Sequence, residues 1–124
     1  MSYKKSFSEV ESKYWGDYKA RMSKAQGVED VKKIFSMFVA DMVKEIEPKL
    51  NPVYGEFEGD FEIDTEGEKK YKVSKKIEED PIYKELVETS DLDAILDKFA
   101  EMAVNKEIHL SKKEPQENGK KIIH

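Results

Sequence analysis

The chain has 124 residues, of which 38% are hydrophobic and 40% are charged, and its formal net charge is −5 at pH 7. This length suits a single domain with one core, and the acidic balance argues against nucleic acid and anionic membranes as partners. Arg21 is the only arginine, which nearly removes bidentate recognition of phosphate groups and guanine. The lack of cysteine excludes disulfides, thiolate nucleophiles and cysteine-based metal sites.

The first helix is predicted from Ser6 to about Ala25. Ser6 is its candidate N-cap, and Glu9 stands three residues later, as in a capping box. Apolar side chains recur at helical spacing through this segment, namely Phe7, Val10, Tyr14, Tyr18 and Met22. Gly27 ends this helix, and the short link predicts antiparallel packing against the next one.

The second predicted helix, with its apolar segment at 31–46 (VKKIFSMFVADMVKEI), contains the most apolar run of the chain. Its apolar face is broad and comprises Val31, Ile34, Phe35, Phe38, Val39, Met42, Val43 and Ile46. A face of this width predicts that other elements cover the helix on at least two sides. Pro48 is expected to end the helix.

From Val53 the hydrophobic period changes from 3.6 to 2, which predicts a β-hairpin over residues 53–77. The loop Thr65-Glu66-Gly67, with glycine last, fits a type I turn followed by a G1 bulge. The resulting register places Phe61 opposite Tyr71. On the other face it pairs carboxylates with lysines, namely Glu62 with Lys70, Asp60 with Lys72 and Glu56 with Lys76.

Two further helices are predicted after the hairpin. Asp80 and Pro81 suit the N-cap and the first position of a short helix. Ser90 is the expected cap of the last helix, with Asp93 in the capping-box position, and Asn105 is expected to end it. Residues 1–110 then form one α+β domain of order ααββαα, with Ile108 and Leu110 in a short extended piece, and residues 111–124 form a flexible polar tail.

The predicted architecture favours a homodimer. A two-stranded hairpin is marginal alone, so it either lies over the central helix or pairs with another copy to extend the sheet. The central helix also offers apolar surface on more than one side. Together these features predict an intertwined or sheet-extended homodimer, most simply with two-fold symmetry.

Five side chains are candidate partner or ligand contacts. Trp15 and Tyr18 lie on the first helix, where amphipathic aromatics serve either a partner interface or the edge of the core. On a helical wheel Glu45 falls inside the apolar arc. It would be an acid, base or metal ligand if it were buried there, or a solvated residue if the last turn emerges into water. Tyr54 and Tyr71 could supply polar groups to a cavity.

The familiar signatures of catalysis and cofactor binding are absent from the sequence. No HExxH, GxSxG or phosphate-loop pattern occurs, and neither His109 nor His124 belongs to a metal-binding spacing. The acidic turn 62–67 resembles the start of an EF-hand calcium loop, but Lys69 and Val73 stand where an apolar residue and a bidentate glutamate are needed. We therefore predict no cofactor, no metal and no catalytic residue.

Two function hypotheses follow. The first is a non-enzymatic protein–protein interaction module that acts as a homodimer and binds another protein through an apolar patch and an acidic surface. The second is a small-molecule-binding protein or an unfamiliar enzyme with a cavity between the central helix and the β-hairpin. No segment is long and apolar enough to span a bilayer, and the start of the chain lacks an apolar signal region, so a cytoplasmic location without a membrane partner is expected.

Overall fold

The computed structural model describes residues 6–54 and 59–123, and their side chains as far as residue 112. It is mostly helical and contains one two-stranded antiparallel hairpin, which confirms the α+β class. The elements in chain order are α1 (Ser8–Ser23), α2 (Val28–Ile46), the 3-10 helix η1 (Pro48–Leu50), β1 (Phe61–Ile63), β2 (Tyr71–Val73), α3 (Lys75–Glu78), α4 (Pro81–Thr89) and α5 (Leu92–Ile123).

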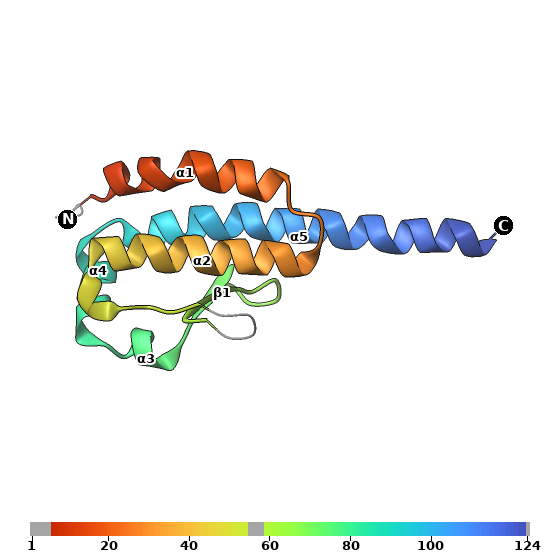
Figure 1. Cartoon of the computed structure of the whole chain (residues 1–124). Helices are drawn as coiled ribbons and strands as arrows, with labels where there is room; N and C mark the ends of the chain where they lie inside the picture. Colours follow the sequence, from red (N-terminus) through yellow and green to blue (C-terminus); the bar gives the residue numbers. More distant parts are fainter. Residues whose placement is uncertain (1–5, 55–58, 124) are drawn as a thin grey trace.

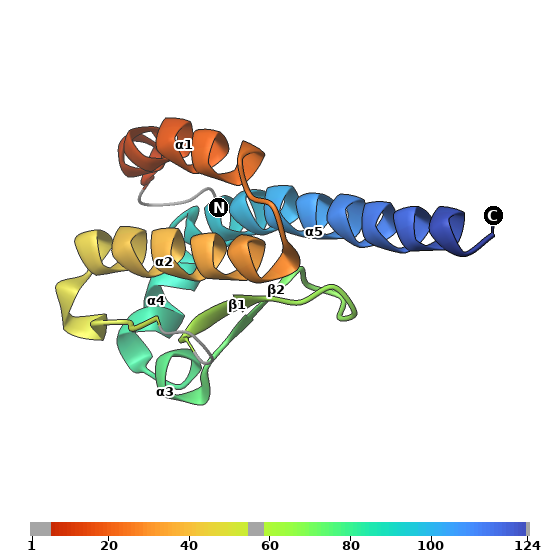
Figure 2. The same cartoon turned by 45° about the vertical axis from the view of Figure 1, so that its right-hand side comes forward.

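Helix α2 lies at the centre of the molecule (Figure 1). Helices α1 and α5 run alongside it, and the hairpin packs on another side, mainly through β1 (Figure 2). The broad apolar face predicted from the sequence is confirmed, because Val31, Phe35, Val39, Met42 and Val43 have no exposed surface. The same chain provides this cover, so the width of the face does not by itself require a second copy. The homodimer stays a prediction.

The N-terminus of α1 is held by Asp91, the residue that precedes α5. The predicted capping box of Ser6 and Glu9 is wrong, since α1 begins at Ser8 and no side chain caps it in that way. Instead, the Asp91 carboxylate accepts hydrogen bonds from the Ser6 hydroxyl at 3.0 Å and from the Phe7 N–H at 2.9 Å. A tertiary contact therefore replaces the local cap.

The hairpin register differs from the prediction by two residues. Phe61 lies opposite Val73, Glu62 opposite Lys72 and Ile63 opposite Tyr71, so the loop runs from residue 64 to residue 70. The loop is wider because the Asp64 carboxylate accepts the N–H groups of Glu66 at 3.0 Å and Gly67 at 3.1 Å. No described glycine has a positive φ, so the predicted G1 bulge is not formed. A shift of two residues keeps each side chain on its predicted face.

Asp60 replaces the predicted charge pairs of the hairpin. Its buried carboxylate accepts the Val53 N–H at 2.8 Å and the Ser74 hydroxyl at 2.7 Å, and it forms an ion pair with Lys76 at 3.5 Å. Burial alone would raise the pKa of Asp60, but these hydrogen bonds and Lys76 lower it. The predicted pairs of Asp60 with Lys72 and of Glu62 with Lys70 are wrong, and Glu56 lies outside the described residues.

Both strands are shorter than predicted, since Val53 and Tyr54 precede β1 without strand structure and β2 ends at Val73. Ser74 ends it by accepting the Ile77 N–H, which makes Ser74 the N-cap of α3. Ile77 therefore lies in a helical turn rather than in the strand, although it remains buried. The cap of α4 is confirmed, because the Asp80 carboxylate accepts the Ile82 N–H at 2.8 Å.

Helix α5 does not end at Asn105 as predicted but continues to Ile123. In the added turns Leu110 is buried, and the Lys106 ammonium donates to the Ser23 carbonyl oxygen at 3.4 Å. The C-terminal part of α5 then extends beyond the other elements (Figures 1 and 2). The extended piece predicted for Ile108 and Leu110 is wrong, whereas flexibility of residues 111–124 stays a prediction. Within the described residues, no helix is long and apolar enough to cross a membrane.

Candidate functional site

Tyr18 belongs to the core. Its side chain is fully buried, and its hydroxyl donates to the Phe99 carbonyl oxygen at 2.6 Å. Its ring centroid lies 4.5 Å from that of Phe99 and 5.4 Å from that of Phe38. Burial raises the pKa of Tyr18. The residue joins α1 to α2 and α5, so its hydroxyl is not free for a ligand.

Trp15 is partly buried beside the same aromatic cluster. Its ring packs edge-on against Phe99 with centroids 5.0 Å apart, and the Lys98 ammonium lies 4.4 Å from the indole centroid. At that distance the cation is attracted by the ring face. One side of Trp15 therefore packs on the core and the ring already has a cationic neighbour, which is typical of a core-edge position.

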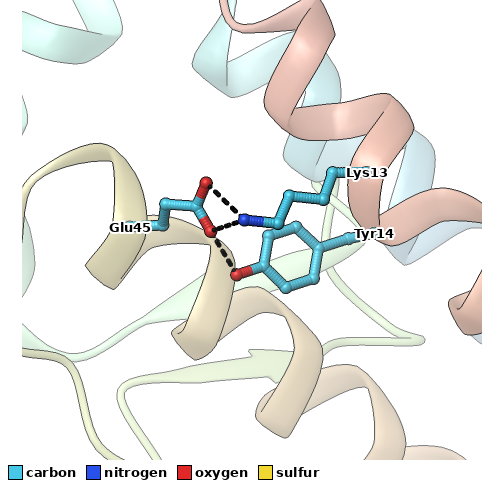
Figure 3. Close-up of polar contacts among 3 residues, drawn as sticks. All are labelled: Lys13, Tyr14 and Glu45. Atoms are coloured by element: carbon cyan, nitrogen blue, oxygen red, sulfur yellow. Dashed lines mark hydrogen bonds and ion pairs between the residues drawn. The ribbon is translucent and has the colours of Figure 1, made fainter.

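Glu45 emerges into water at the end of α2, the second of its two alternatives. It accepts the Tyr14 hydroxyl at 2.6 Å and both its oxygens contact the Lys13 ammonium at 3.0 Å (Figure 3). These hydrogen bonds, that from Tyr14 first, lower the pKa of Glu45. Burial and then Glu45 raise the pKa of Tyr14 to about 12. Glu45 is thus an ionised residue that links α1 to α2.

Tyr54 lies on the connector before the hairpin. It is 45% exposed, and its sequence neighbour Val53 is 51% exposed. The backbone of Val53 is bound to Asp60, which fixes this connector against the start of β1. Of Tyr54, Glu45 and Tyr71, only Tyr71 lines one of the two described pockets.

Tyr71 is buried at the start of β2, and its hydroxyl donates to an Asp93 carboxylate oxygen. The same oxygen, Oδ1, accepts the Lys69 ammonium at 2.9 Å, while Oδ2 has no hydrogen-bond donor among the described residues. Tyr83 on α4 lies close enough to Tyr71 to raise its pKa. The hairpin, α4 and the first turn of α5 therefore meet at one polar cluster.

The pKa shifts in this cluster keep its two phenols neutral and its carboxylate charged. Burial, the neighbouring Tyr83 and the Asp93 carboxylate raise the pKa of Tyr71, and burial raises the pKa of Tyr83 to about 12. Partial burial of Asp93 would raise its pKa, but the hydrogen bonds from Tyr71 and Lys69 lower it. At neutral pH both phenols are protonated and Asp93 carries its charge.

A pocket of about 630 Å³ opens beside this cluster, and we call it the Tyr71–Asp93 pocket. Val73 and Val87 give it apolar walls, and the phenol rings of Tyr71 and Tyr83 extend them. Charged side chains of both signs complete the lining, namely Lys69, Lys72, Lys84, Glu78, Glu88 and Asp93. The volume falls within the range of small-molecule sites.

Sequence reasoning identified Tyr71 but missed its partners. Asp93 was predicted to complete a capping box, whereas its side chain turns towards Tyr71 and Lys69. Tyr83 was not among the predicted contacts. The lining of this pocket comes from the hairpin and its loop, α3, α4 and α5, and includes no residue of α2. These residues meet only through tertiary packing, which local patterns do not encode. The predicted cavity against the central helix is a different location and stays a prediction.

Within the described residues, no group of three or more histidine, aspartate or glutamate side chains is placed to hold a metal ion. In the acidic turn 62–67, the Asp64 carboxylate already accepts the backbone N–H groups of Glu66 and Gly67, and these hydrogen bonds lower its pKa. No protein-family model matches the sequence, and neither a curated protein nor a solved structure is significantly similar to it.

Proposed function

We propose that the protein is a non-enzymatic binding protein whose site is the Tyr71–Asp93 pocket. The observation that supports this most is the combination of a pocket of about 630 Å³ with an ionised carboxylate at its wall. Two aromatic rings and two valines supply the apolar surface that such sites use for affinity. A location in the cytoplasm is part of the proposal, because the chain lacks cysteine.

The lining favours a small zwitterion with an apolar or aromatic body. Three lysines and three carboxylates line the pocket, so its net charge is balanced. Oδ2 of Asp93 is the acceptor offered to an ammonium group. Lys72 and Lys84 are the cations offered to a carboxylate, because Lys69 is already bound to Asp93. A free α-amino acid with an aromatic side chain has this distribution of groups.

Binding is favoured over catalysis because of the protonation states in the pocket. A general acid or base works best when its pKa lies near the working pH. The pKa of Tyr83 is raised to about 12, that of Tyr71 is also raised and that of Asp93 is lowered. All three groups are therefore held away from neutrality, which suits fixed hydrogen-bond donors and acceptors.

Calorimetric titration with phenylalanine tests the proposal. We expect saturable binding that Asp93→Asn weakens about tenfold, because the ammonium group loses a charged acceptor. Asp97→Asn is the matched control, since Asp97 lies one turn later on α5 and does not line the pocket. Phenethylamine and hydrocinnamate, which lack one charge each, should both bind more weakly. Absence of binding, or equal effects of the two variants, would contradict the proposal.

A second proposal is the homodimeric interaction module. Support comes from the adjacent exposed side chains of Val53 and Tyr54, and from a described sheet of only two strands, each with one edge that no strand covers. Sedimentation over a range of protein concentrations tests it, with Tyr54→Asp as the variant that should favour the monomer. A wild-type protein that sediments as a single copy at every concentration would rule out the homodimer.

A further inference from the structure

A second pocket, of about 470 Å³, lies at the corner where α1 leads into α2. It shares no lining residue with the Tyr71–Asp93 pocket. Its apolar part is formed by Ala25, Ile34 and Met37. Its charged part comprises Arg21, Lys24, Lys33 and Asp30. We call it the Arg21 pocket.

The cations of the Arg21 pocket have no carboxylate partner within the described part of the chain. The ion pairs of the described residues are formed by Lys13, Lys69, Lys76 and Lys98. None of them involves Arg21, Lys24 or Lys33. The Asp30 carboxylate is directed to the backbone, where it accepts the Gln26 N–H at 3.3 Å. Three cations against one carboxylate leave a local net charge of +2 in a chain whose net charge is −5.

Helix dipoles explain only part of this arrangement. Arg21 and Lys24 stand at the C-terminal end of α1, where cations are favoured. Lys33 stands in the second turn of α2, where the dipole gives no reason for a positive charge. A solvated face would also explain isolated lysines, but it would not explain why three cations surround an apolar floor.

We propose that the Arg21 pocket binds a phosphate monoester that carries an apolar group. A phosphate monoester has a charge of about −1.5 to −2 at pH 7, which matches the local charge of the pocket better than a single carboxylate does. The Arg21 guanidinium supplies the planar fork that recognises phosphate oxygens, and its Cζ lies 5.8 Å from the Phe38 ring centroid, a contact that positions it. Ala25, Ile34 and Met37 receive the apolar group.

Calorimetric titration with phenyl phosphate at physiological ionic strength tests this site. We expect saturable binding that Arg21→Gln and Lys33→Gln each weaken about tenfold, the usual effect of losing one charge-assisted hydrogen bond. Inorganic phosphate should bind more weakly than phenyl phosphate because it cannot use the apolar floor. Circular dichroism shows whether each variant is folded. If Arg21→Gln does not fold, the effect of Lys33→Gln on phenyl phosphate binding tests the proposal.

Lys32→Gln is the matched control. Lys32 adjoins Lys33 on α2 and is also exposed, but it does not line the pocket, so the two variants make the same change of net charge. Binding by Lys32→Gln should stay within about twofold of wild type, because Lys32 does not line the pocket and an exposed charge without direct contact to the ligand contributes little at physiological ionic strength. The proposal is overturned if phenyl phosphate does not bind, if inorganic phosphate binds equally well, or if Lys32→Gln weakens binding as much as Lys33→Gln.

Discussion

The molecule contains two clusters of the same composition, each with a tyrosine, a carboxylate and a lysine. In one, Tyr14 and Lys13 of α1 contact Glu45 of α2; in the other, Tyr71 and Lys69 of the hairpin contact Asp93 of α5. Both lysine side chains are 62% exposed, and the carboxylate side chains are 36% and 39% exposed. The ion pairs are therefore closely matched in their contact with water.

The two clusters differ in the burial of their tyrosines. Tyr71 is only 4% exposed, whereas Tyr14 is partly buried at the edge of the core. The hydroxyl of Tyr14 can turn to water if its carboxylate is lost, but the hydroxyl of Tyr71 would lose its acceptor in a buried position. Only the Tyr71 cluster borders one of the two described pockets. Ion pairs of similar exposure can thus connect two helices at the surface in one place and border a pocket in another.

Replacing each tyrosine by alanine should give the largest difference in stability between the two clusters. Tyr71→Ala removes a buried ring and should lower the free energy of unfolding by about 3 kcal/mol, the usual cost of such a cavity. Tyr14→Ala removes a ring that is only partly buried and should lower it by about 1 kcal/mol. Urea unfolding followed by circular dichroism measures both values. Equal losses would show that the two clusters do not differ as described.

Replacing each carboxylate should give a smaller contrast. Asp93→Ala leaves the buried Tyr71 hydroxyl without its acceptor and should lower the free energy of unfolding by about 1 to 2 kcal/mol. Glu45→Ala should leave the melting temperature close to that of the wild type, because exposed ion pairs contribute little. Thermal unfolding in parallel detects the difference. A Glu45 variant that melts as early as the Asp93 variant would contradict this account.

Acid should weaken the Tyr71 cluster. The pKa of Asp93 is lower in the folded chain than in the unfolded chain. Its contribution to stability is therefore present above the unfolded pKa, about 3.9, and is lost as the pH falls through the folded pKa. Denaturation midpoints measured between about pH 5 and pH 2 should fall less steeply for Asp93→Asn than for the wild type, although Asp60 retains its own acid dependence. Identical slopes would indicate that the pKa of Asp93 is not lowered.

The smallest expected effect concerns the Tyr14 cluster at high pH. Tyr14 has a pKa of about 12, raised first by burial and then by Glu45, so its phenol should ionise later than a free tyrosine. Because folding favours the neutral phenol, this contribution is present below the unfolded pKa of about 10 and is lost as the pH rises towards the folded value. In Glu45→Gln the Tyr14 pKa should fall but stay raised, because burial remains. Phenolate absorbance in wild type and variant measures the change, with Tyr14→Phe identifying the signal.

The sequence predicted those parts of the fold that depend on local patterns. The broad face of α2, the end of that helix before Pro48 and the Asp80 cap of α4 were all predicted, because helical periodicity and capping act within a few residues. The hairpin was found but its register was wrong by two residues. The Asp64 side chain holds a wider loop than the predicted three-residue turn, and Lys76 forms an ion pair with Asp60, a contact that the predicted register did not contain.

The candidate site was predicted less well than the fold. Tyr71 was named, but Asp93 and Tyr83 were not connected to it, because they lie on other elements and meet it only when the hairpin packs on α4 and α5. Asp91, which holds the start of α1 from the far side of the sequence, was missed for the same reason. Pairings between distant segments depend on the packing of whole elements, and a single sequence gives little information about it.

Chemical-shift mapping of the isotope-labelled chain with phenylalanine tests the central claim most directly, because the two tyrosine clusters can be followed in one experiment. We predict concentration-dependent shifts of the backbone amides of Tyr71, Val73, Tyr83, Val87 and Asp93, with the amides of Lys13, Tyr14 and Glu45 unchanged. Shifts that concentrate at the Tyr14 cluster, or a spectrum that phenylalanine leaves unchanged, would contradict the assignment of binding to the Tyr71–Asp93 pocket.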